Sequence, residues 1–105
     1  GWDFPMLAMT AARLHEPDKA IDMLFYDAHN NRFGLSGMTP RFHLITTQAG
    51  QEYRRDAETY FPSNGALLLA VGLMAAGWDG DATPQPGFPK DGRWKIRSEG
   101  LRPLP

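Results

Sequence analysis

The sequence contains no cysteine, which excludes disulfide bonds, thiolate metal sites and cysteine nucleophiles. It also lacks an excess of charge, because 11 Lys and Arg residues face 12 Asp and Glu residues and leave a net charge of −1. The basic residues are scattered along the chain, so nucleic acid and anionic membranes are poor candidates as partners. These absences leave the cellular location open.

The histidines lack the spacing of a metal site. His15, His29 and His43 stand far apart, and none belongs to a His-Glu-x-x-His pattern. We therefore expect no metal ion and no other cofactor. Hydrophobic residues make up 42% of the chain and charged residues 22%, which is ordinary for a folded domain and too apolar for a disordered one.

Two helices are predicted in the first part of the chain. The first covers residues 4–14, with Asp3 as its N-cap and Pro5 in its first turn, and it is apolar around most of its circumference. The second covers residues 17–28, opens with Pro17, and has one apolar stripe and one polar face. The short connection between them predicts an antiparallel hairpin.

A third helix is predicted over residues 65–76, with Ser63 or Asn64 as its cap. Residues 66–76 include no polar side chain. A run of this length is too short to span a bilayer, which needs about 20 residues, and is typical of a core helix. Gly77 then supplies a stop signal.

Two regions lack a helical pattern. Residues 29–62 form a long connection in which only residues 41–47 have the character of a short strand, and a connection of this length is typical of a functional loop. Residues 79–105 are rich in Pro and Gly and form an irregular tail, with a possible strand at residues 93–98. We therefore divide the chain into a helical part, residues 1–78, and a tail, residues 79–105.

The predicted helices have more apolar surface than a free-standing domain of this size could cover. Two of them are apolar on nearly every side, and only one amphipathic helix is available to cover them. Burial of a large aliphatic side chain is worth about 1.5–3 kcal/mol, so an uncovered flank costs a large share of a small domain's stability. Either the chain oligomerises, or it is part of a larger helical protein.

Four segments carry a resemblance to a known family. They are Gly1-Trp2-Asp3-Phe4-Pro5-Met6, Ala8-Met9-Thr10-Ala11-Ala12-Arg13-Leu14, Ala20-Ile21-Asp22-Met23-Leu24 and Pro62-Ser63-Asn64-Gly65-Ala66-Leu67-Leu68. Over residues 1–78 the chain resembles the last hairpins of the six-hairpin (α/α)6 toroid glycosidases. The resemblance implies an all-α fold with three helices in the order inner, outer, inner, followed by the irregular tail.

The same resemblance implies a function. The chain is expected to be the C-terminal fragment of a carbohydrate-active glycoside hydrolase, a hydrolase of carbohydrate metabolism, and to be inactive alone. Its partners would be the carbohydrate substrate of the intact parent and the upstream helical hairpins of the same domain. A related enzyme with lyase or phosphorylase chemistry is a further possibility, because one scaffold hosts several reactions.

The resemblance also implies a place for substrate, since the cleft of this family lies at the N-terminal ends of the inner helices. The expected substrate-binding residues are Trp2, Asp3, Arg41, His43, Tyr60 and Asn64. Flat aromatic faces stack on sugar rings, and neighbouring polar groups bind hydroxyls. Each also has a structural reading: the polar ones as helix caps or a solvated strand face, the aromatic ones as covers over helix ends.

The catalytic residues stay unknown. Glycoside hydrolysis normally needs two carboxyl groups, and the candidates Asp3, Asp56 and Glu58 form no convincing pair. Some families of this fold place an acidic residue before the last inner helix, where this chain has Phe61-Pro62-Ser63-Asn64. The alternative function is a non-catalytic helical interaction or oligomerisation module, in which the third helix docks on a partner or a second copy.

Overall fold

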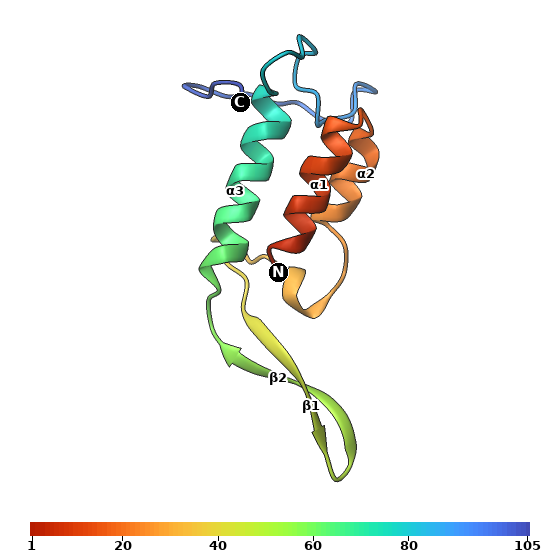
Figure 1. Cartoon of the computed structure of the whole chain (residues 1–105), viewed down its shortest axis with the longest axis vertical. Helices are drawn as coiled ribbons and strands as arrows, with labels where there is room; N and C mark the ends of the chain where they lie inside the picture. Colours follow the sequence, from red (N-terminus) through yellow and green to blue (C-terminus); the bar gives the residue numbers. More distant parts are fainter.

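The computed structural model describes the whole chain, residues 1–105. It contains three helices, α1 (Asp3–Arg13), α2 (Pro17–Leu24) and α3 (Phe61–Ala76), a short 3-10 helix, η1 (His29–Asn31), and two strands, β1 (Arg41–Thr47) and β2 (Gly50–Ala57). α1 packs against both other helices, antiparallel to α2 and parallel to α3 (Figure 1). The two strands project as a hairpin beyond the N-terminal end of α3, so that the molecule measures 55 × 24 × 24 Å.

The prediction of an all-α fold is wrong. β1 and β2 pair as a two-stranded antiparallel sheet, and together with the three helices they make an α+β arrangement. The description of the chain as the last hairpins of a purely helical toroid fails for the same reason. The strand at residues 41–47 is confirmed, but its partner β2 was missed because its seven solvent-exposed residues offer no apolar alternation.

The starts of α1 and α3 differ from the expected ones, whereas α2 begins at Pro17 as predicted. α1 begins at Asp3 itself, and Asp3 is therefore not the N-cap but an acidic residue of the first turn, where the helix dipole favours it. α3 begins at Phe61 because Pro62 occupies its first turn, where a missing N–H costs nothing. Neither Ser63 nor Asn64 caps this helix; its N-cap position is Tyr60, without a side-chain cap.

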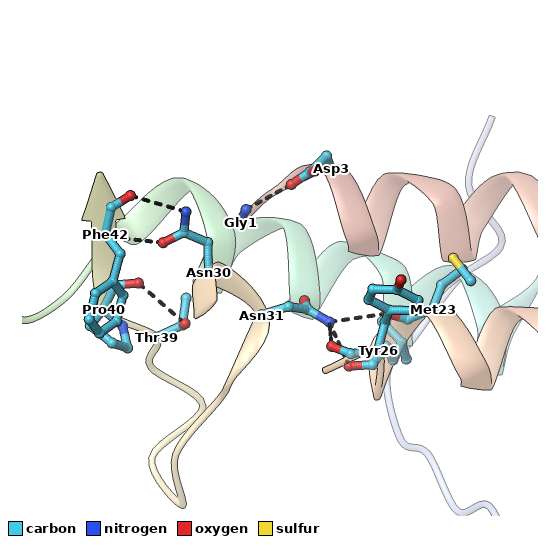
Figure 2. Close-up of polar contacts among 10 residues, drawn as sticks. Gly1, Asp3, Met23, Tyr26, Asn30, Asn31, Thr39, Pro40 and Phe42 are labelled. Atoms are coloured by element: carbon cyan, nitrogen blue, oxygen red, sulfur yellow. Dashed lines mark hydrogen bonds and ion pairs between the residues drawn. The ribbon is translucent and has the colours of Figure 1, made fainter. Parts of the chain in front are cut away.

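α2 ends at Leu24 and not near residue 28. The side-chain amide of Asn31 donates to the carbonyl oxygens of Met23, Leu24 and Tyr26, at 3.2, 3.3 and 2.9 Å (Figure 2). Carbonyl oxygens in the last turn of a helix have no partner within the regular helix, and the Asn31 amide donates to two of them, those of Met23 and Leu24. A single buried side chain thus ends the helix and turns the chain toward the hairpin.

The core is small and lies where α1 meets α2 and the C-terminal half of α3. Its members are Ala8, Ala12, Ala20, Leu73, Met74, Ala75, Trp78 and Phe88. The prediction that α1 and α3 are buried on nearly every side is wrong, because large apolar side chains on both helices remain exposed, among them Leu7 and Leu68. None of the helices has the length and apolar character needed to cross a membrane.

The tail packs back on the helices without forming a strand. No strand occurs at residues 93–98; the one pairing is a parallel bridge between Trp78 and Leu104. Gly87 approaches α3 closely, and its backbone N–H donates to the carbonyl oxygen of Met74 at 3.0 Å. The prolines of the tail lack a backbone N–H, so the tail cannot form a regular strand ladder and packs through isolated contacts instead.

Candidate functional site

The N-terminal ends of α1 and α3 lie side by side. Gly1 packs so closely on α3 that a Cβ atom there would overlap Ser63 Oγ and lie 3.4 Å from Tyr60 Cδ1. The Ser63 hydroxyl is buried under this contact and has no hydrogen-bond partner. Because the two helices are parallel, the positive ends of both helix dipoles meet at this edge of the molecule. We refer to this edge, with Trp2, Arg41, Tyr60 and Asn64, as the rim.

Two hydrogen bonds fasten the loop before β1 to the rim. The backbone N–H of Tyr60 donates to the carbonyl oxygen of Thr39 at 2.9 Å. The side-chain amide of Asn64 donates to the carbonyl oxygen of Gly37, also at 2.9 Å. Gly37 has a φ of +77°, a conformation that favours glycine. These bonds hold the loop against the first turn of α3, and only the nitrogen of the Asn64 amide is engaged by them.

Asp56, which the sequence offered only as a catalytic candidate, links His43 to Arg41, and Arg41 lies over the Tyr60 ring. Asp56 Oδ2 lies 3.1 Å from His43 Nε2 and 3.8 Å from Arg41 Nη1. The Arg41 guanidinium in turn lies 5.3 Å from the centroid of the Tyr60 ring. The pairing register shifts between Arg41 and Phe42, and this irregularity brings Asp56 to the face of the two basic residues.

Trp2 and Asp3 occupy the α1 side of the rim. The Trp2 side chain is 50% exposed, so a flat aromatic face is open to solvent. The Gly1 amino group donates to Asp3 Oδ1 at 2.7 Å (Figure 2). This hydrogen bond, helped by the positive charge of the same amino group, lowers the pKa of Asp3 and keeps it ionised.

No pair of carboxyl groups at the rim has the arrangement that glycoside hydrolysis needs. Asp3 is bound by the Gly1 amino group, Asp56 by Arg41 and His43, and Glu58 by Arg55 at 3.1 Å. No group of three or more His, Asp or Glu side chains converges on a point where a metal ion could bind.

Three consecutive residues that position the hairpin were missed. Asn30 exchanges two hydrogen bonds with the backbone of Phe42 (Figure 2). His29 stacks on the Tyr53 ring with their centroids 3.9 Å apart. Asn31 ends α2, as described above. The run His29-Asn30-Asn31 offers a weak signal, since Asn side chains often bond to nearby backbone and favour turns over helices.

A second concave feature lies away from the rim. An apolar groove of about 550 Å³ runs between α2 and α3 and is closed by the tail; its walls include Leu24, Phe25, Leu67, Val71, Phe88 and Trp94. The ion pair of Asp27 and Arg32, 2.8 Å apart, borders the groove and lowers the pKa of Asp27. None of the predicted substrate-binding residues contributes to this groove.

Comparisons of the chain with protein-family models, with curated proteins and with solved structures find no match. The geometry of the rim and of the exposed helix faces therefore carries the functional proposals that follow.

Proposed function

We propose that this chain forms one edge of the sugar-binding cleft of a glycoside hydrolase. The observation that supports the proposal is the rim, where the N-terminal ends of α1 and α3 place Trp2, Arg41, Tyr60 and Asn64 at one edge of the molecule. The catalytic carboxyl groups would come from other parts of the intact protein, packed on the exposed side of α1 that carries Met6 and Leu7.

The chemistry of the rim suits a neutral, hydroxyl-rich ligand. The exposed Trp2 ring offers an apolar face for the C–H surface of a pyranose. Arg41 and His43 both contact Asp56, which orients their side chains, and the Asp56 carboxylate offsets the positive charge of Arg41. The Asn64 oxygen offers an acceptor, because the amide nitrogen is already bound to Gly37. Oriented donors and acceptors beside an aromatic face are what a sugar site requires.

The test is a titration of the isotope-labelled chain with neutral sugars, followed by nuclear magnetic resonance. The probes are glucose, galactose, xylose, maltose and cellobiose. We expect shifts of the Trp2 indole N–H and of the amides near Tyr60 and Asn64. Tyr60→Leu should remove them, whereas Phe25→Leu, at an exposed aromatic of the separate groove, should leave them unchanged.

The same titration can also contradict the proposal. If none of these sugars moves the rim signals, or if the shifts gather around Phe25 and Trp94, the chain does not bind sugar at the rim. We expect no glycoside cleavage by the chain alone, because two of its candidate carboxyl groups, Asp56 and Glu58, are each paired with an arginine. Cleavage that survives Asp56→Asn and Asp3→Asn would place the catalytic groups elsewhere in this chain.

A second function, a helical interaction module, is favoured by a different observation. α3 carries no ionisable side chain, and Leu68, Leu69 and Val71 are exposed on it. A surface of this kind typically marks a contact with another protein. This candidate does not exclude the first, because Leu68, Leu69 and Val71 are not among the residues of the rim.

A further inference from the structure

One side of α3 forms an apolar stripe that is exposed over its first three turns and half-buried at Gly72 and Ala76. It consists of Phe61, Gly65, Leu68, Leu69, Gly72 and Ala76. In Figure 1 this helix stands at the edge of the helical layer, with α1 on one side only. Phe61 and Leu68 are each 68% exposed and Leu69 is 49% exposed. A Cβ atom added at Gly65 or Gly72 would meet nothing within 4 Å.

The stripe has small residues along its middle and leucines on its flanks. On a helix with 3.6 residues per turn, Gly65 and Gly72 fall on the centre line, and Leu68 and Leu69 fall on opposite sides of it. The two glycines leave hollows that let another backbone approach closely. The leucines form two ridges beside these hollows, and ridges and hollows of this kind allow two helices to interlock.

The stripe is also symmetric about its own centre. Gly65 and Gly72 lie at equal sequence distances on either side of the Leu68–Leu69 pair, and so do Phe61 and Ala76. An antiparallel second copy, related by a two-fold axis at this centre, would place its Gly72 opposite Gly65 and its small Ala76 opposite the large Phe61. Each leucine would meet its own counterpart. This is the self-complementarity that a two-fold interface needs.

Charge and surface area support a second copy as the occupant. α3 has no ionisable side chain, so two such faces do not repel each other, and antiparallel helix dipoles attract. The chain exposes 7150 Å², whereas a compact monomer of 11.7 kDa exposes ~5,900 Å². The projecting hairpin accounts for part of the excess. A standard interface removes roughly 800 Å² from each partner, which is less than the excess of the chain as a whole.

We propose that two copies of this chain associate through the α3 stripe as an antiparallel, two-fold symmetric pair, with the helices in close contact at Gly65 and Gly72. The inference develops the second candidate function and does not depend on sugar binding at the rim.

Disulfide trapping tests the geometry directly, because the natural chain contains no cysteine. Leu68→Cys should form a cross-linked dimer on mild oxidation. Phe61→Cys should not cross-link with itself but should do so when mixed with Ala76→Cys. Leu44→Cys, at an exposed position on the hairpin, is the matched control and should remain uncross-linked. Self-cross-linking of Phe61→Cys without the mixed product would overturn the antiparallel arrangement.

Sedimentation of the cysteine-free chain tests the association itself. The natural chain should form a dimer as its concentration rises. Gly72→Glu should raise the dimer Kd at least ~10-fold, because it fills the central hollow and buries an unpaired charge. The variant should still fold, since glutamate is a better helix former than glycine and the site is open in the monomer. Circular dichroism checks its helix content.

Gly34→Glu is the control for the added charge, since Gly34 lies in an exposed loop and its nearest contact is 3.7 Å away. It should dimerise like the natural chain. A folded monomer at all concentrations, or a Gly72→Glu variant that dimerises unchanged, would overturn the proposal. Either result would leave the sugar titration unaffected, so failure of the dimer and failure of the cleft proposal are distinguishable.

Discussion

Asn30 and Phe42 exchange two hydrogen bonds that tie the hairpin to the helical part. The backbone N–H of Phe42 donates to Asn30 Oδ1 at 2.7 Å, and Asn30 Nδ2 donates to the Phe42 carbonyl oxygen at 3.2 Å (Figure 2). An isolated two-stranded hairpin is marginally stable in water. The Asn30 amide thus supplies an anchor at the base of the sheet, next to the stack of His29 on Tyr53.

We expect Asn30→Ala to loosen the hairpin while the helices remain folded. Loss of two hydrogen bonds should weaken the attachment by about 1–3 kcal/mol. Amide hydrogen exchange should therefore become faster in β1 and β2 and stay unchanged in α1. Gln48→Ala, in the exposed turn of the hairpin, is the control. Equal protection of the hairpin in both variants would show that Asn30 does not anchor it.

Gly87 is expected to tolerate no side chain. A Cβ atom there would lie 2.5 Å from Met74 Cα and overlap the Met74 side chain, so either α3 or the tail must move. Overpacking of this kind costs typically about 1–3 kcal/mol. Urea unfolding followed by circular dichroism should report a loss in this range for Gly87→Ala. Gly34→Ala, in open surroundings, should change the free energy of unfolding far less; similar losses for both would refute a close approach of the tail.

Acid should destabilise the protein through its aspartates. Hydrogen bonds from the Thr83 hydroxyl and backbone N–H, and the nearby charge of His15, lower the pKa of Asp81 below its usual 3.8. A lowered native pKa stabilises the fold above the unfolded value, and this contribution is lost as pH falls through the native pKa. The folded state should therefore lose the stabilisation from ionised Asp81 as the pH falls below about 4.

The measurement is the thermal midpoint of the natural chain and of Asp81→Asn between about pH 7 and about pH 2. The variant lacks the charge but keeps an acceptor for the Thr83 N–H, whose hydrogen bond is 2.8 Å long. It should be the less stable protein near neutral pH, and the difference should shrink as the pH falls below about 4. A difference that is constant with pH would mean that the Asp81 charge contributes nothing.

Local signals predicted the existence of all three helices and some of their ends, among them the end of α3 at Ala76 before Gly77. Pro17 placed the start of α2 correctly because a proline at the first turn acts within its own helix. The end of α2 depends on Asn31, whose partners are brought near by the turn of the chain, and no sequence pattern marks that encounter. β2 was missed because both of its faces are in solvent, so its pairing with β1 leaves no apolar alternation.

The candidate site likewise has a part that the sequence predicts and a part that depends on the tertiary structure. The aromatic and polar residues before α1 and α3 could be named from the sequence, since helix starts are recognisable from proline and capping residues. Their meeting at one rim depends on α1 and α3 being parallel neighbours. The link from His43 through Asp56 to Arg41 depends on the irregular register of the hairpin.

The sequence by itself determined three helices, the absence of disulfides, and more apolar helix surface than one small domain can cover. Those properties follow from composition and from the 3.6-residue period, which are local. Only the tertiary structure decided that residues 41–57 pair as a projecting hairpin, and that one side of α3 is among the apolar surfaces left uncovered. Both depend on which elements become neighbours, and that outcome is settled by contacts between residues far apart in the chain.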